Sequence, residues 1–249
     1  MSSLADRVAI VTGSAGNIGR AIALRLARDG AAVMAHAKQN GDGVAETQRL
    51  IETAGGRADG HLADLSTEAG ARGLIDAAVG RFGRLDILVN NAAIRRNTPF
   101  VEMSLADWHE VMANSLDCAF LAARYAVPHM QTGRWGRIVN ITGITLHRGT
   151  PGRAHVGAAK AAMVGMTRSL ALELAPDGIT VNCVSPGLID TERGGAAGAR
   201  PDASKTMAIP VGRDGRPDEI AHVVTMLCQP DGAYTTGQTI QVNGGVNFS

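Results

Sequence analysis

Short apolar runs recur along the chain at residues 8–11, 32–35, 86–89, 137–141 and 179–184. Runs of this length are typical of strands that are buried on both faces, as in a parallel sheet. We therefore predict a core strand at each of these five positions.

The segments between these runs have the periodicity of amphipathic helices, in which apolar residues return every three or four positions. Three such stripes are Ile18, Ile22 and Leu26; Leu74, Ala78 and Phe82; and Met163, Thr167, Leu170 and Leu174. Strands that alternate with helices predict an α/β fold built on a doubly wound parallel sheet. Residues 1–249 show no composition break and no internal repeat, so we predict a single domain.

One long connection lacks a clear period. Residues 190–210 are rich in Gly, Ala and Arg and end in Ala-Ile-Pro. Loops of this length are uncommon inside a compact domain unless they are functional. We expect a substrate lid here, and an irregular surface loop is the alternative.

The composition argues against several classes of partner. The chain has 24 Lys and Arg against 23 Asp and Glu, so it lacks the positive charge of a nucleic-acid or membrane-surface binder. Asp6 precedes an apolar run that is too short for a signal peptide or a transmembrane span. Cys118, Cys183 and Cys228 form no Cys-x-x-Cys pair, so we expect neither a disulfide nor a metal site. We expect a cytoplasmic protein with no nucleic-acid and no membrane partner.

A glycine-rich turn follows the first predicted strand and opens the first predicted helix. Glycines at such a turn let the backbone approach a dinucleotide pyrophosphate, and the helix N-terminus presents unpaired N–H groups to the anion. The residues of this turn that we expect to bind the cofactor are Gly13, Ser14, Asn17, Ile18 and Gly19.

The spacing of this turn, with a glycine six residues after Thr-Gly13, resembles the short-chain dehydrogenase/reductase family. The resemblance covers nearly the whole chain. Further matching segments are residues 62–65, the Asn-Asn-Ala-Ala run at 90–93, Asn114, the loop at 186–191 and the segment at 236–245. The resemblance implies a Rossmann-like sheet of about seven strands with helices on both faces, and an NAD(P)-dependent oxidoreductase activity.

The resemblance also assigns cofactor contacts outside the turn. It implies that Asp64 and Leu65 lie against the adenine. The other residues that it places around the cofactor are Asn91, Ala92, Lys160, Pro186, Gly187, Ile189 and Thr191. Asn17 replaces the middle glycine of the family's turn, but Asn tolerates a positive φ better than most residues, so we expect the turn to be preserved.

The choice between NAD and NADP is usually made at the end of the second strand, where an acid binds the ribose hydroxyls of NAD. Ala37 stands at this position and Lys38 follows it. The missing acid and the adjacent cation favour NADP. NAD remains the alternative, with Lys38 as a surface lysine.

The catalytic end departs from the family's pattern. The resemblance implies a tyrosine four residues before Lys160 and a serine thirteen residues before that tyrosine, but the chain has Val156 and Gly143 there. Lys160 and Asn114 are retained. The resemblance implies that Lys160 binds the ribose and that Asn114 has a structural and catalytic role. General acid catalysis contributes roughly 10²- to 10⁴-fold, so its loss would slow hydride transfer while cofactor binding remained.

Three groups could replace the missing acid. His155 has a suitable reference pKa of about 6.5, but one residue along a helix turns a side chain by about 100° away from the Lys160 face. It could point inward if the helix begins late. Thr145 could reach inward from the loop, and a bound water is the third possibility. Thr142 should point to the opposite side of its strand, and either threonine could simply be a structural hydroxyl.

Basic residues gather in the loops that we expect around the substrate. They are Arg95, Arg96, His147, Arg148, Arg153 and His155. If these side chains converge, they favour an anionic substrate such as a carboxylate or a phosphate ester. Solvated arginines on separate loops are the alternative.

Three functions are consistent with these features. The first is an NADP(H)-dependent oxidoreductase that acts on a small carbonyl or alcohol substrate with an atypical proton donor. The second is non-redox chemistry on the same fold, such as lyase, dehydratase or isomerase action. The third is a non-catalytic partner subunit of an active homologue. The family commonly assembles through its long helices, so we expect a dimer or homotetramer, with a hetero-oligomer as the alternative.

Overall fold

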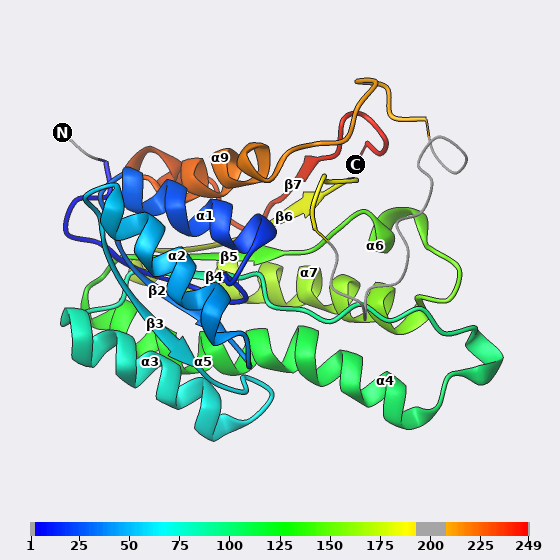
Figure 1. The fold of residues 1–249 in the computed structure, drawn as a ribbon, viewed down its shortest axis with the longest axis horizontal. Coiled ribbons are helices and arrows are strands. Elements are labelled where there is room, and N and C mark those ends of the chain that lie inside the picture. Colours follow the sequence, from blue (N-terminus) through cyan, green and yellow to red (C-terminus); the bar gives the residue numbers. More distant parts are fainter. Residues whose placement is uncertain (1–2, 193–207, 249) are drawn as a thin grey trace.

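A parallel sheet runs through the centre of the computed structural model, which describes residues 3–192 and 208–248. The seven strands of this described part have the order β3-β2-β1-β4-β5-β6-β7 (Figure 1). They are β1 Val8–Val11, β2 Ala32–Ala37, β3 Arg57–Leu62, β4 Ile87–Asn90, β5 Gly136–Ile141, β6 Ile179–Pro186 and β7 Thr239–Val242. The strand order reverses between β1 and β4, and ligands of doubly wound folds bind at the carboxyl ends of the strands beside such a reversal.

Helices cover both faces of the sheet, as Figure 1 shows. One face packs against α1 Asn17–Arg28, α2 Gly41–Thr53 and α9 Pro217–Cys228. The other face packs against α3 Glu68–Phe82, α5 Cys118–Thr132 and α7 Ala154–Leu174. Each face has its own aliphatic core, and the predicted doubly wound α/β fold is confirmed.

The five predicted strands are all present; β1 has the predicted ends, and the ends of the other four differ by one or two residues. The pattern missed β3 and β7, which lie at the two edges of the sheet. Their side chains are mostly half-buried or exposed, so neither strand forms a continuous apolar run. The predicted stripes face the core, although Phe82 and Leu170 are only partly buried where they pack against it.

A chain of buried polar side chains links β4, β5, β6 and α7. Asn90 Nδ2 donates to Asn140 Oδ1 at 2.8 Å, and Asn140 Nδ2 donates to Thr167 Oγ1 at 2.8 Å. Thr167 Oγ1 lies 3.1 Å from Cys183 Sγ. Since unpaired polar groups are costly to bury, these bonds fix the position of α7 beneath the strand ends.

None of the helices in residues 3–192 and 208–248 is long and apolar enough to cross a bilayer. Cys118, Cys183 and Cys228 are all buried and carry free thiols.

We predict that Asn140→Ala lowers the free energy of unfolding by about 2 kcal/mol or more, because it removes two hydrogen bonds and leaves Asn90 and Thr167 without them in the core. Urea unfolding followed by circular dichroism measures the change. Thr53→Ala, at an exposed site at the end of α2, is the control and should change stability little. An equal, small effect of both substitutions would show that the polar chain contributes nothing to stability.

Candidate functional site

The glycine-rich turn is held against the strand-end loop of β4 by a set of close contacts. Asn91 Nδ2 donates to the carbonyl oxygens of Thr12 and Gly13, both at 3.0 Å. Thr12 Oγ1 accepts from the backbone N–H groups of Asn91 and Ala92, also at 3.0 Å. A Cβ atom on Gly19 would collide with the Gly13 carbonyl oxygen. The turn is therefore closely packed against the loop after β4.

The structure places the other residues of the turn in different ways. Asn17 has a φ of +51°, a positive value of the kind that asparagine was expected to tolerate at this position. Its Nδ2 donates to the Glu192 carbonyl oxygen at 2.9 Å. Ser14 and Ile18 are buried. Ser14 Oγ accepts from the His36 N–H at 2.9 Å, so this hydroxyl faces the sheet. Any contact of Ser14 and Ile18 with a cofactor would be made by their backbones.

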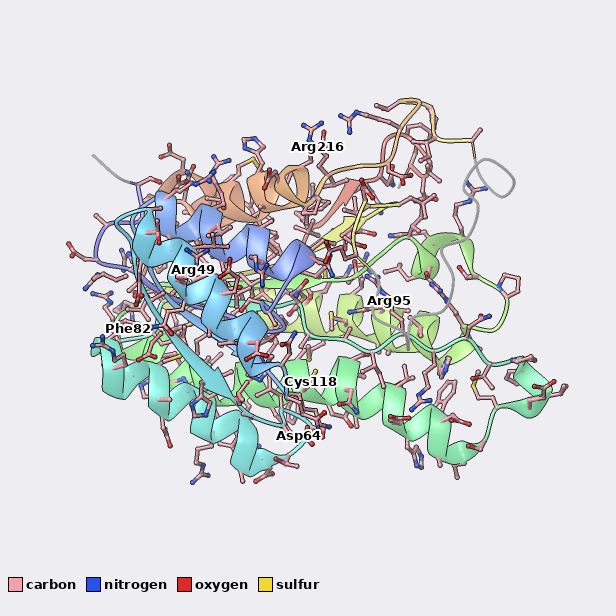
Figure 2. All side chains as sticks on the ribbon, viewed as in Figure 1. Arg49, Asp64, Phe82, Arg95, Cys118 and Arg216 are labelled. Carbon is pink, nitrogen blue, oxygen red and sulfur yellow. The ribbon has the colours of Figure 1, made fainter. Side chains whose placement is uncertain are left out.

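Residues at the ends of β2 and β3 form the next wall. Lys38 Nζ lies 2.8 Å from Asp64 Oδ2 and 3.4 Å from Asn114 Oδ1, so it reaches both. The Lys38 ammonium and the Ser66 hydroxyl hold the pKa of the Asp64 carboxyl below its usual value. Figure 2 shows Asp64 beyond the end of β3. Leu65 is buried in the core below this wall.

Sequence reasoning missed His36, the next-to-last residue of β2. The side chain is 2% exposed. Its Nδ1 accepts from the Gly13 N–H at 3.3 Å, and its Nε2 lies 3.0 Å from the Ala63 carbonyl oxygen. The available signal was a polar residue inside the otherwise apolar run Ala32–Ala37.

Asn114 lies in a π-helical turn, Ala113–Asp117, between α4 Leu105–Met112 and α5. Its Nδ2 donates to the Glu110 carbonyl oxygen at 2.9 Å. π-helical turns are rare and are frequent at functional sites. The side-chain oxygen of Asn114 faces Lys38, which links this turn to the wall at β2.

Lys160 is buried on α7 at the same end of the sheet. Its Nζ donates to the Ile141 carbonyl oxygen at 2.7 Å, at the end of β5. Burial lowers the pKa of Lys160 to about 8, and the positive charge of Arg95 acts in the same direction. The amine is thus a titratable group close to neutrality.

Val156 lies one turn before Lys160 on α7 and is 6% exposed. Gly143 follows β5 with a φ of +156°, a conformation that residues with a side chain rarely adopt. A Cβ atom there would meet nothing closer than the Pro186 carbonyl oxygen at 4.0 Å. There is space for a side chain at Gly143, but the backbone conformation disfavours one. Thr142 Oγ1 donates to the Val184 carbonyl oxygen at 3.2 Å, as a structural hydroxyl does.

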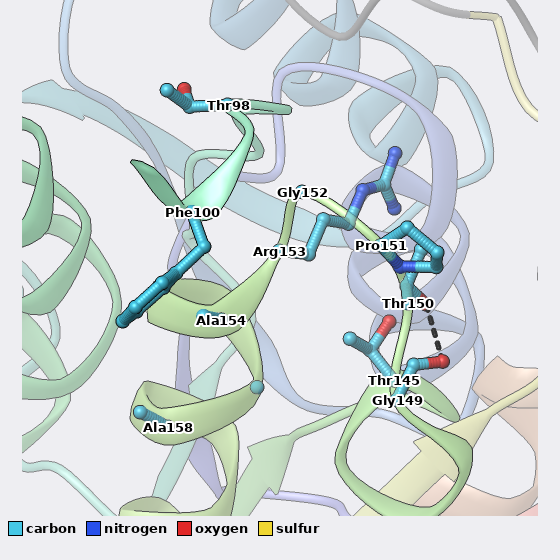
Figure 3. Close-up of a pocket in the computed structure, with 11 residues that line it drawn as sticks. Thr98, Phe100, Thr145, Gly149, Thr150, Pro151, Gly152, Arg153, Ala154 and Ala158 are labelled. Carbon is cyan, nitrogen blue, oxygen red and sulfur yellow. Dashed lines mark hydrogen bonds between the residues drawn. The ribbon is translucent and has the colours of Figure 1, made fainter. Parts of the chain in front are cut away.

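A cavity of about 410 Å³ lies beside the N-terminus of α7. Figure 3 shows Phe100 and Thr145 on the two sides of the first turns of this helix. Thr145 is the first residue of α6 Thr145–Arg148. The cavity is lined by Thr98, Phe100, Thr145, Gly149–Ala154, Gly157 and Ala158. Thr145 therefore lies in the cavity wall.

His155 does not line this cavity. It is the second residue of α7 and is 0% exposed. Burial lowers its pKa, and the charges that act on it belong to Asp107, Arg96 and Arg153. Lys160 is influenced by a different set of residues. The helix begins before His155, so the late start that would turn its ring inward is not observed. Its catalytic role stays a prediction.

The basic residues of the loops do not all gather at one point, although Arg96 and Arg153 both act electrostatically on His155. Arg96 is paired with Glu110 at 2.6 Å, and Arg148 Nη1 donates to the Val246 carbonyl oxygen at 3.1 Å. His147 Nε2 lies 2.7 Å from Gln241 Nε2. Arg153 lies in the cavity wall, and Arg95 lies on the loop after β4 (Figure 2).

The loop after β6 is supported by the C-terminal segment. The Gly187 N–H donates to the Val242 carbonyl oxygen at 2.9 Å, and a Cβ atom on Gly187 would lie 2.7 Å from Asn243 Cα. Ile189 pairs with Gly215 in an isolated bridge, and Thr191 Oγ1 donates to the Ile189 carbonyl oxygen at 3.5 Å. Of the expected lid at 190–210, residues 193–207 lie outside the described residues.

Comparisons with known proteins agree with this geometry. Residues 13–247 match the family model described as enoyl-(acyl carrier protein) reductase. The chain is similar to the 3-oxoacyl-[acyl-carrier-protein] reductase FabG of Aquifex aeolicus, with 37% identity over 98% of each chain. It is also similar to the (2S)-[(R)-hydroxy(phenyl)methyl]succinyl-CoA dehydrogenase subunit BbsD of Thauera aromatica, with 38% identity over 96% of each chain.

Among solved structures, a double mutant of a Serratia marcescens short-chain dehydrogenase/reductase superposes with a TM-score of 0.91. It is 36% identical, and the match covers 98% of this chain and 99% of that chain.

The burial of Lys160 predicts a pH dependence of stability. Its pKa of about 8 lies below the reference value of 10.5, so the Lys160 amine binds more protons in the unfolded chain between these pH values. Lys160 should therefore contribute a rise in the free energy of unfolding across this window, of at most about 3 kcal/mol. The buried thiols of Cys118 and Cys228 have raised pKa values and act in the opposite direction, so the expected result is that the native protein gains this amount relative to Lys160→Met across the window. Urea unfolding at several pH values measures both profiles.

Lys38→Met is the matched control, because it removes an ammonium group that is 48% exposed. Its pH profile should follow that of the native protein across the window. Parallel profiles for the native protein and Lys160→Met would contradict the assigned burial of the amine.

Proposed function

Because the chain belongs to the short-chain dehydrogenase/reductase family, we propose that it is an NADP(H)-dependent oxidoreductase that interconverts a carbonyl and an alcohol with an atypical proton donor. One observation carries this proposal. The glycine-rich turn is packed so closely that a Cβ atom on Gly19 would collide with it, and the buried amine of Lys160 lies at the same end of the sheet.

The residues of the turn and the neighbouring strand ends fit a dinucleotide. The φ of +65° at Gly13 and the missing side chain at Gly19 suit a pyrophosphate close to the N-terminus of α1. Lys38 would pair with a 2′-phosphate, since Ala37 offers no carboxylate to repel it. Lys160 would hold the nicotinamide ribose. The bound cofactor would supply or accept the hydride.

Since Val156 stands where a tyrosine would be expected, another group must transfer the proton to or from the substrate oxygen. Thr145 offers a hydroxyl in the cavity wall, where it would hydrogen-bond the substrate oxygen. Lys160 has a pKa of about 8, and general acids work best when their pKa is close to the operating pH. We assign the proton to Lys160, delivered through a water molecule.

The similarity to an enzyme named as a 3-oxoacyl-[acyl-carrier-protein] reductase makes 3-oxoacyl thioesters the first carbonyl substrates to test. Arg153 in the cavity wall favours a substrate that carries an anionic group. We assign the same cavity to both the carbonyl and this group.

A second candidate function is that of a non-catalytic partner subunit. It is favoured by the absence of a proton-transferring side chain at Val156 and by a relative that is named as a dehydrogenase subunit. Phe120 on α5 is 47% exposed and Leu172 on α7 is 83% exposed. We propose that these long helices form the contact between copies of this chain, or with a homologue.

The first prediction of this proposal concerns cofactor choice. Lys38→Ala should weaken NADPH binding by about tenfold or more, because a charge-assisted contact with the 2′-phosphate contributes about 1.5–3 kcal/mol. NADH binding should change by less than about threefold, which serves as the internal control. Fluorescence titration of both reduced cofactors measures the two affinities. Equal losses for both would remove Lys38 from the 2′-phosphate site.

The second prediction concerns turnover. With 3-oxoacyl thioesters and NADPH, the native protein should show slow loss of the reduced nicotinamide absorbance. Thr145→Val should lower kcat by about tenfold or more, with NADPH affinity intact. Val156→Tyr should raise kcat by roughly 10²-fold or more by restoring a general acid.

Thr150→Val is the matched control for Thr145→Val, because Thr150 lines the same cavity and its hydroxyl already donates to the Gly149 carbonyl oxygen. It should keep native kcat. Loss of turnover in His155→Gln with NADPH affinity intact would assign the proton to His155 instead. Absence of native turnover together with activity of Val156→Tyr would favour the partner-subunit function.

A further inference from the structure

His36 connects two segments of the cofactor site that are far apart in the sequence. The ring lies between the Gly13 N–H, in the glycine-rich turn after β1, and the Ala63 carbonyl oxygen, directly after β3. The backbone of His36 joins the same assembly, because the Ser14 N–H donates to its carbonyl oxygen at 2.8 Å. From its place on β2, the side chain thus connects the glycine-rich turn after β1 to the segment after β3 that carries Asp64.

The two contacts define the protonation of the ring. A backbone N–H can only donate, so Nδ1 must accept from Gly13 and carry no proton. A carbonyl oxygen can only accept, so Nε2 must carry the proton that it donates to Ala63. The ring is therefore neutral and in one tautomer.

The surroundings of His36 favour this neutral state. Burial is the largest cause that lowers its pKa, which is about 4, and the neighbouring His61 on β3 acts in the same direction. Charged groups of the described residues at this end of β2 include the Lys38–Asp64 pair and Arg20 of α1, which donates to the Ala15 and Gly43 carbonyl oxygens.

We infer that His36 is a positioning residue of the dinucleotide site, whose neutral ring fixes the distance between the pyrophosphate-binding turn and the adenine-binding wall. This inference rests on the proposed cofactor binding. A dinucleotide must contact the turn and the wall at once, so its affinity depends on their separation. A nucleotide that carries no 5′-phosphate contacts the wall alone and depends on their separation much less.

The test compares two variants and two probes. Gln can accept with its Oε1 and donate with its Nε2, so His36→Gln should keep NADPH affinity within about threefold of native. His36→Leu loses both hydrogen bonds and should weaken NADPH binding by about tenfold or more, but binding of adenosine 2′-monophosphate by less than about threefold. Titration calorimetry gives both affinities, and His222→Gln on the exposed face of α9 is the control.

A nuclear magnetic resonance measurement on the native protein tests the same inference without a variant. The ring nitrogens of His36 should show the Nε2–H tautomer, unchanged between about pH 8 and pH 5.5, whereas an ordinary histidine titrates near 6.5. A His36 ring that titrates in this range would overturn the inference, as would native NADPH affinity in His36→Leu. If the native protein binds no dinucleotide at all, the proposed function fails as well.

Discussion

The close approach of backbone segments at the end of β1 is the constraint on which the candidate site depends. Gly13 and Gly19 lie so near each other and Asn91 that a methyl group at Gly19 would displace the turn. The Asn91 side-chain amide binds this turn to the strand-end loop of β4 through two carbonyl oxygens. This contact joins the two strands that flank the reversal in strand order, so it places the N-terminus of α1 and the loop after β4 around one shared space.

The site that we propose has two halves, which depend on different interactions. The nucleotide half is built from backbone hydrogen bonds and from the two hydrogen bonds of the His36 ring, and it needs few reactive side chains. The substrate half lies around the start of α7, where Val156 and Gly143 provide no acid and no hydroxyl. Lys160 belongs to both halves, because it is anchored to β5 by the Ile141 carbonyl oxygen and also lies on the helix that borders the cavity. The buried Asn90, Asn140 and Thr167 hold that helix in place.

Much of the fold could be predicted from the apolar runs, because strands with two buried faces leave a pattern that depends only on neighbouring residues. β3 and β7 were not predicted, because an edge strand is partly exposed and its sequence alternates between apolar and polar residues without a continuous apolar run. The candidate site was less predictable. The distance between Lys38 and Asp64, the π-helical turn at Asn114 and the position of His36 between Gly13 and Ala63 all depend on contacts between distant segments. The scattered directions of Arg96 and Arg148 likewise follow from their ion pair and backbone partners.

The backbone at Gly143 makes the departure from the family's pattern hard to reverse by small steps. Its φ of +156° is open to glycine and unfavourable for other residues, and the next residue is fixed by the bond from the Ile144 N–H to the Pro186 carbonyl oxygen at 3.0 Å. A serine at position 143 would therefore strain the main chain in its present conformation. The loop would have to change its path first. A hydroxyl beside the substrate is therefore more accessible from another position, as Thr145 in the cavity wall shows, than from a side chain at Gly143.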